Sequence, residues 1–231
     1  LGNNLKDRSA GTVIRYNWIE GGNRQLDLVE TDYDDIAALS AYDETFVYGN
    51  LLIEPDGAGN SQILHYGGDG GGHYRTGTLY FYHNTVISTR SGNTTLMRLS
   101  TNDASADLRN NLLYAAAGGA RFAITSGRGQ IQLSGNWLPV GWRDTHEAAL
   151  EPGASIQTGS NTEGVDPGLA GLGDGDYSLT IDAAAADCGG TIASEAVAAE
   201  GQVAWQYVRH QARIERPDDG LPDAGALEGS P

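Results

Sequence analysis

Cysteine and positive charge are scarce in this chain of 231 residues, and long apolar runs are absent. The single cysteine, Cys188, excludes an internal disulfide framework and a cysteine-rich zinc site. Only 14 Lys and Arg oppose 30 Asp and Glu, giving a formal net charge of −16. Nucleic acid and anionic membrane surfaces are both bound through clustered cations, so neither is expected as a partner. No apolar stretch is long enough for a transmembrane helix, so we expect no membrane insertion.

Glycine, in contrast, is abundant, with 33 residues or about twice the usual share. The 39% of hydrophobic residues suffices for a thin core. The length favours one elongated domain, or one domain with a cap. The chain opens at Leu1 without a signal-type segment, so we interpret it as a mature protein or a fragment whose upstream coils are missing.

One pattern recurs five times between residues 12 and 139. Each copy has an Asn, an apolar residue three places before it and another two places after it. The Asn residues are Asn17, Asn50, Asn84, Asn111 and Asn136. A regular strand would place the two apolar positions on opposite faces, because they are an odd number of residues apart. We therefore predict a bend at each Asn, a residue that tolerates the left-handed backbone region.

A second alternating segment follows four of these copies, at 25–30, 62–67, 95–100 and 121–126. Loop lengths vary while the strand pattern persists, as in a solenoid whose coils cover one another. Stacked coils would align the Asn side chains in a hydrogen-bonded ladder. The sequence thus predicts an all-β fold, and its residues resemble a right-handed parallel β-helix of the pectate-lyase-like superfamily.

The repeat pattern ends near residue 143. We expect coils over 1–143 and an irregular C-terminal coil and cap over 144–231, because an exposed coil end is a sheet edge that invites aggregation. The segments 166–179 and Asp223–Glu228 resemble the ends of bacterial extracellular β-helix proteins. That resemblance, the few lysines and the acidic composition predict a secreted or cell-surface protein.

The first coil, residues 5–30, resembles the catalytic coil of β-helix lyases that act on alginate and chondroitin. The resemblance implies that Lys6 removes the proton α to a uronate carboxylate, with Arg8 on the same strand face. It also implies calcium bound by acidic residues of an earlier coil. Val29 stands where these lyases have an arginine. Alternatively, Lys6 is a solvated cation at a strand edge.

Asp27, His65 and Arg98 each lie between two apolar residues of a second strand. If the apolar neighbours point inward, these three side chains point outward in successive coils. Such a row is either a groove for a charged sugar, with Asp27 and His65 catalytic and Arg98 binding substrate, or a structural ladder of ion pairs.

The glycine-rich stretch 65–75 carries Asp69, His73 and Arg75. It lacks the features of a phosphate loop. We interpret it first as a connector between strands, with a substrate-covering loop beside the groove as the alternative. A metal ion held by His65, Asp69 and His73 is disfavoured because a flexible loop preorganises ligands poorly.

Two places before the repeat Asn, a further column of outward positions contains Arg15, Tyr48, Tyr82 and Arg109. Stacked tyrosines between arginines would suit sugar rings and carboxylates. The interpretation that we favour is that the tyrosines only cover strand edges.

The function favoured by these features is a secreted, lyase- or hydrolase-like enzyme acting on an acidic polysaccharide. A non-catalytic carbohydrate-binding protein and a structural or adhesive β-helix of a bacterial surface are the alternatives. The sequence leaves the oligomeric state and the polymer open.

Overall fold

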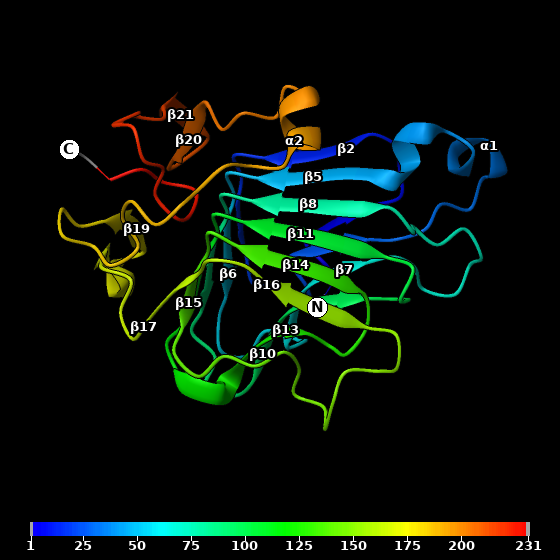
Figure 1. The fold of residues 1–231 in the computed structure, drawn as a ribbon, viewed down its shortest axis with the longest axis horizontal. Coiled ribbons are helices and arrows are strands. Elements are labelled where there is room, and N and C mark those ends of the chain that lie inside the picture. The colour runs from blue at the N-terminus through cyan, green and yellow to red at the C-terminus, as the bar shows by residue number, and fades with distance from the viewer. Residues whose placement is uncertain (1, 230–231) are drawn as a thin grey trace.

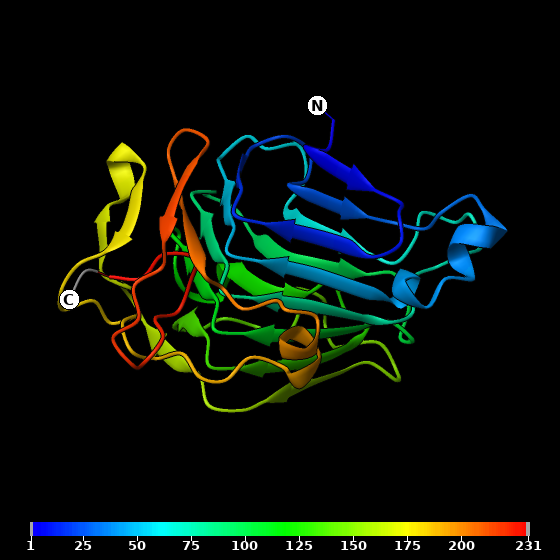
Figure 2. The same ribbon diagram turned by 90° about the horizontal axis from the view of Figure 1, so that it is seen from above.

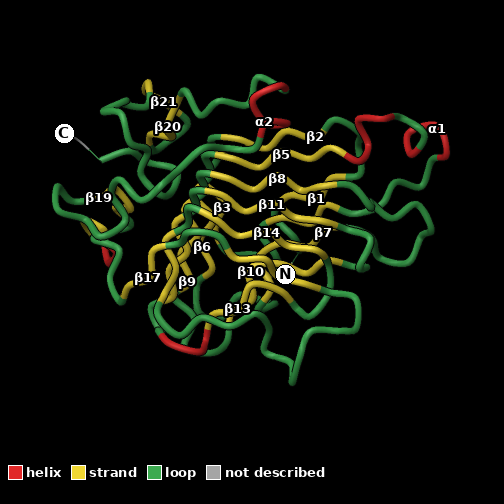
Figure 3. Tube along the Cα trace, in the orientation of Figure 1, coloured by secondary structure: helices red, strands yellow, loops and turns green. Residues whose placement is uncertain are grey.

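The computed structural model describes residues 2–229 and shows an all-β protein built on three parallel sheets (Figure 1; Figure 3). Sheet A contains β1 (Leu5–Asp7), β4 (Leu26–Leu28), β7 (Gln62–Tyr66), β10 (Thr94–Leu99) and β13 (Phe122–Thr125). Sheet B contains β2 (Thr12–Arg15), β5 (Glu44–Tyr48), β8 (Thr78–Tyr82), β11 (Ser105–Arg109), β14 (Gln130–Ser134) and β16 (Ser155–Thr158). Sheet C contains β3 (Trp18–Glu20), β6 (Leu51–Glu54), β9 (Thr85–Ser88), β12 (Leu112–Ala115), β15 (Trp137–Pro139) and β17 (Thr162–Gly164).

From β1 to β15 the chain visits the three sheets in turn, so each of these coils adds one strand to every sheet, whereas the last coil adds only β16 and β17 to sheets B and C. Each strand pairs in parallel with the corresponding strand of the coil before it. This arrangement is compatible with the predicted parallel β-helix. The short helix α1 (Asp34–Ala37) and a 3-10 turn (Ser40–Asp43) lie in the connection between β4 and β5.

The predicted Asn ladder is present and has a sixth member. Side-chain amides donate to the next Asn Oδ1 at 2.9 to 3.2 Å, from Asn17 through to Asn161. The predicted bend lies one residue earlier than expected. Positive φ angles occur at the residue before the first five Asn, at Tyr16, Gly49, His83, Asn110 and Gly135. The side-chain amide of the ladder Asn donates hydrogen bonds to backbone carbonyl groups at the bend, while the residue before it adopts the left-handed conformation.

Both apolar columns of the repeat face the interior, as predicted. The main core cluster contains Ile14, Val47, Phe81, Leu108 and Leu133 from one column, and Ile19, Leu52, Val86, Leu113 and Leu138 from the other. Successive coils therefore bury the same positions against one another, which is what holds a solenoid together.

The coils extend beyond residue 143, because β16 and β17 continue sheets B and C. After Gly164 come the antiparallel pairs β18 (Leu169–Gly171) with β19 (Asp176–Leu179), and β20 (Trp205–Val208) with β21 (Ala212–Glu215), and the helix α2 (Ser194–Ala198). Further 3-10 turns occupy Gly119–Arg121 and Leu172–Asp174.

The C-terminal segment packs along the side of the coils instead of only closing their end (Figure 1; Figure 2). The outer face of sheet C is apolar, so it must be shielded from solvent by another segment of the chain. A second hydrophobic cluster joins Leu51, Ile87 and Trp137 of that sheet to Ala224 and Ala226. The closing segment Asp223–Glu228 is tied down there by Gly225 N–H donating to Asn110 O at 2.8 Å. Within residues 2–229, no helix has the length and apolar character needed to cross a membrane.

Candidate functional site

Four charged or titratable side chains form a row on sheet A, hereafter the polar row: Lys6, Asp27, His65 and Arg98. Lys6 pairs in register with Asp27, Asp27 with His65, and His65 with Arg98. The residues on either side of the last three belong to the main core: Leu26, Leu28, Leu64, Tyr66, Met97 and Leu99. The alignment predicted from sequence is therefore confirmed, and these side chains point away from that core.

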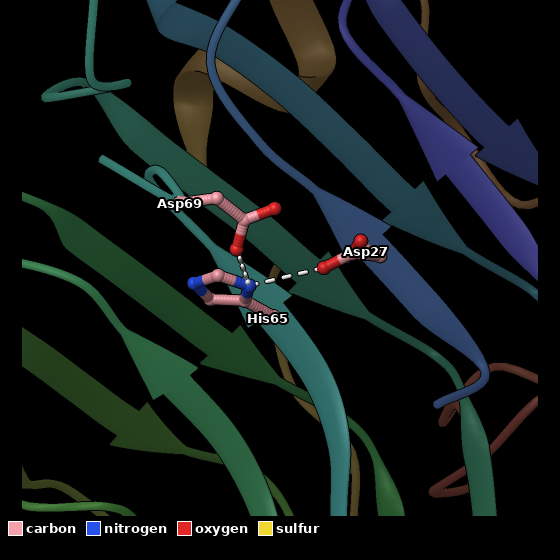
Figure 4. Close-up of side chains that lie close together, drawn as sticks. All are labelled: Asp27, His65 and Asp69. Atoms are coloured by element: carbon pink, nitrogen blue, oxygen red, sulfur yellow. Dashed lines mark hydrogen bonds and ion pairs between the residues drawn. The ribbon is translucent and has the colours of Figure 1, made fainter. Parts of the chain in front are cut away.

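The centre of the polar row is a carboxylate–imidazole pair (Figure 4). Asp27 Oδ1 lies 3.0 Å from His65 Nδ1, and both side chains are almost fully buried. Lys6 Nζ contacts Asp27 Oδ2 at 3.0 Å, and the Asn3 side-chain amide donates to the same oxygen at 2.6 Å. Both Asp27 oxygens are thus engaged by donors.

The glycine-rich loop 67–75 reaches the polar row through Asp69. Asp69 Oδ2 contacts Lys6 Nζ at 2.9 Å. Its Oδ1 lies 3.6 Å from His65 Nδ1, as Figure 4 shows. Buried Glu30 fixes this loop by accepting the amide N–H groups of Asp69 at 2.6 Å and Gly71 at 2.5 Å. Burial acts to raise the pKa of Glu30, but these amides outweigh it and hold that pKa below its usual value.

The ion pairs shift the pKa values of Asp27 and Lys6 in opposite directions. Burial acts to raise the pKa of Asp27, but the hydrogen bonds from His65 and Lys6 and their charges outweigh burial and hold it well below its usual range. The bond to Asp69 is the main reason that the pKa of Lys6 is raised, with Asp27 adding to it against some desolvation. A general base at neutral pH needs a lowered lysine pKa, so this arrangement does not favour the base role expected for Lys6.

Ser100 completes a serine–histidine–aspartate chain that the sequence did not reveal. Its Oγ lies 2.8 Å from His65 Nε2. The same oxygen accepts the Gly68 N–H and donates to Gly68 O, both at 2.9 Å. Because Gly68 already engages the hydroxyl as donor and acceptor, we assign Ser100 to positioning of the loop and of His65, not to nucleophilic attack.

Both ring nitrogens of His65 are engaged. Nε2 lies 2.8 Å from Ser100 Oγ, and Nδ1 lies 3.0 Å from Asp27 Oδ1 and 3.6 Å from Asp69 Oδ1. These contacts fix the orientation of the imidazole ring within the polar row.

The ligand atoms of Asp27, His65 and Asp69 lie within 4.8 Å of one another, close enough for a metal ion. Calcium, however, takes six to eight oxygen ligands, and this group offers a nitrogen and two carboxylates. The ammonium of Lys6 already bridges those carboxylates. The group does not fit calcium, and we derive no step through a metal.

Two further candidates, Arg8 and His73, lie outside the polar row. Arg8 contacts Glu30 O at 2.7 Å and Asp32 Oδ1 at 3.2 Å, beside the loop anchor. His73 Nε2 pairs with the exposed Asp34 at 2.8 Å.

Arg75 is fully buried, which is at odds with its expected contact with substrate. Its guanidinium donates to Val29 O, Tyr42 O, Ser9 O and Asp7 Oδ2. The long side chain clamps three segments together, so its role is structural.

The aromatic column of Arg15, Tyr48, Tyr82 and Arg109 is in register on sheet B, as predicted. The tyrosine rings stack 4.9 Å apart but are only 1% and 2% exposed. The C-terminal segment covers them with Ala193 and Ala196, and Tyr82 donates to Gly201 O at 2.7 Å. At this burial neither ring can contact a sugar, so the expected substrate contact of Tyr48 and Tyr82 is wrong. Both rings instead pack beneath the C-terminal segment.

No family model matches the chain, and neither a curated protein nor a solved structure does. The arrangement of the polar row is therefore the basis of the functional conclusion.

Proposed function

We propose that the protein is a secreted or surface-located right-handed β-helix of the pectate-lyase-like type that acts on an acidic, uronate-containing polysaccharide. The observation that carries the proposal is the polar row, in which an acid–base pair stands between the cations Lys6 and Arg98 on one sheet face. Strands of adjacent coils are spaced by about 4.8 Å, close to the length of one sugar ring. A polysaccharide lying across the coils would place one sugar ring over each residue of the polar row.

Asp69 occupies the position that we assign to the substrate carboxylate. It is 44% exposed, stands on a loop rich in glycine, and contacts both Lys6 and His65. A uronate carboxylate that displaced Asp69 would take over the pairing with Lys6. In elimination, His65, oriented by Asp27, would take the proton from the carbon next to the carboxylate while the bond to the leaving oxygen breaks, and would pass that proton to the oxygen. In hydrolysis it would protonate the leaving oxygen while a water molecule adds to the sugar and releases its own proton to solvent.

Incubation with a panel of uronate polymers tests this proposal. Absorbance from new unsaturated ends indicates elimination, and reducing ends without absorbance indicate hydrolysis. His65→Gln should abolish either signal, while Arg121→Gln, which removes an exposed cation that is not a member of the polar row, should not. Wild-type protein that produces neither signal on any polymer contradicts an enzymatic role.

Asp69→Ala sharpens the same experiment. It frees Lys6 from its exposed partner, so affinity for a uronate oligosaccharide should rise. Unchanged or weaker binding would show that Asp69 does not hold the place of the substrate.

A second function is favoured by the complete internal pairing of Lys6, Asp27 and His65. A row with no free base suits a non-catalytic carbohydrate-binding protein. Binding of oligouronides without turnover, lost in Lys6→Met, would support this alternative. Absence of binding as well would favour a structural or adhesive β-helix.

A further inference from the structure

The outer face of sheet B carries a depression of about 390 Å³ that is separate from the polar row. It crosses β8, β11, β14 and β16 and is bounded by Ser194 and Glu195 at the start of α2. Its volume lies within the range of about 300–1,000 Å³ typical of small-molecule sites. Sequence reasoning did not identify it, because its wall comes from a segment far along the chain.

The depression exists because one outward column changes from large to small side chains. Phe46, Tyr80, Asp107, Gln132 and Gln157 are paired in register across successive strands. Phe46 and Tyr80 stack with ring centroids 5.1 Å apart and an interplanar angle of 12°. Stacking along the sheet turns the other face of Tyr80 toward β11, where the shorter Asp107 leaves room.

The polar groups beyond Tyr80 are arranged for a ligand rich in hydroxyl groups. Asp107 and Arg109 form a two-point pair, with Nε to Oδ1 at 2.7 Å and Nη2 to Oδ2 at 2.9 Å. This pairing fixes both side chains and leaves further donor and acceptor capacity. Gln132 and Gln157 add exposed amides, which can donate and accept.

Charge in the depression disfavours an anion. The charge of Arg109 is neutralised by Asp107, and Glu195 adds a further, exposed carboxylate. A uronate or phosphate would meet acidic groups without a free cation. An aromatic face combined with amides and a neutralised ion pair suits the apolar face and hydroxyl groups of a neutral sugar.

We propose that this depression binds a neutral oligosaccharide, with one ring on the free face of Tyr80 and the following rings over β11, β14 and β16. The strand spacing of about 4.8 Å again matches one ring per coil. The protein then has two carbohydrate-binding faces of different specificity, one for uronate units on sheet A and one for neutral units on sheet B.

Titration of the full chain with cellohexaose, xylohexaose, mannohexaose and maltohexaose, followed by calorimetry and amide chemical shifts, tests this inference. At least one hexasaccharide should bind and shift resonances of β11 and β14. Gln132→Trp, at an exposed position, should fill the depression and abolish binding. Tyr80→Ala should weaken binding by about tenfold or more.

Lys6→Met is the matched control, because it alters the polar row and should leave neutral-sugar binding unchanged. The inference is overturned if none of the four hexasaccharides binds, or if binding survives Gln132→Trp with unchanged affinity. A parallel titration with an oligouronide reports on sheet A, so failure of the neutral site is distinguishable from failure of the proposed function.

Discussion

The polar row on sheet A and the aromatic column on sheet B have the same construction but are covered by different segments of the chain. Both place one side chain per coil in register on the outside of the sheet. The aromatic column is sealed by Ala193, Ala196 and Gly201 from the C-terminal segment. The polar row is covered mainly by a glycine-rich loop that contacts it through the half-exposed Asp69. Asp27 and His65 are as buried as the two tyrosines, whereas Lys6, Arg98 and Asp69 remain partly exposed. The comparison teaches that the covering segment, not the column itself, decides how much of a column reaches solvent.

The largest effect is expected from truncation in the aromatic column. Tyr82→Ala removes a buried ring that stacks on Tyr48, and we expect it to cost about 3–5 kcal/mol of unfolding free energy. Tyr82→Phe keeps the ring and loses only the bond to Gly201 O, at a cost of about 1 kcal/mol. Urea denaturation measures both. Equal effects of the two variants would show that the column is not held by ring packing.

The polar row should depend on charge instead. Asp27→Asn keeps the shape but removes the partner of His65 and Lys6, so we expect a loss of about 3 kcal/mol at pH 7. Because the pKa of Asp27 is lowered on folding, its stabilisation is present above the unfolded pKa of about 4 and is lost as pH falls through the lower folded value. The difference between wild type and variant should therefore shrink below pH 4. A constant difference across that range would contradict the charge argument.

The two buried histidines are His65 on sheet A and His83 beside sheet B, and His83 gives a separate pH dependence of stability. His83 lies where sheet B turns into sheet C, and burial together with the charge of Arg216 lowers its pKa to about 3. The unfolded chain takes up a proton near pH 6.5 that the folded chain refuses, so stability falls as pH drops from about 6.5 towards 3. Between pH 6.5 and 4.5 this loss is about 2–3 kcal/mol. Unfolding of His83→Gln across this range should show a smaller loss than wild type, and an identical profile would contradict it.

The smallest effect on stability should come from Lys6→Met. Its side chain is 40% exposed, and exposed ion pairs contribute about 0–1 kcal/mol. The same variant should strongly weaken binding of a uronate oligosaccharide under the proposed function. A large loss of stability without a change in binding would make the polar row a structural ladder like its aromatic counterpart.

Much of the coil architecture was readable from sequence because a solenoid repeats its contacts at short, visible intervals. The Asn register, both apolar columns and the alignment of Asp27, His65 and Arg98 followed from local pattern alone. Asn161 was missed because Thr158 and Glu163 stand where the other repeats have apolar residues. The position of the bend was misassigned by one residue, since Tyr16 and His83 carry no glycine-like signal for positive φ.

The covering contacts were decided only by tertiary structure. Gly201 contacts Tyr82, which is 119 residues away in the sequence, and Asp69 contacts Lys6, which is 63 residues away. Ser100, Glu30 and Arg75 acquire their roles from partners in other coils. Strand periodicity records which way a side chain points, but it carries no information about what a distant segment lays over it. Sequence therefore determined the columns, and the folded chain determined which segment covers each of them.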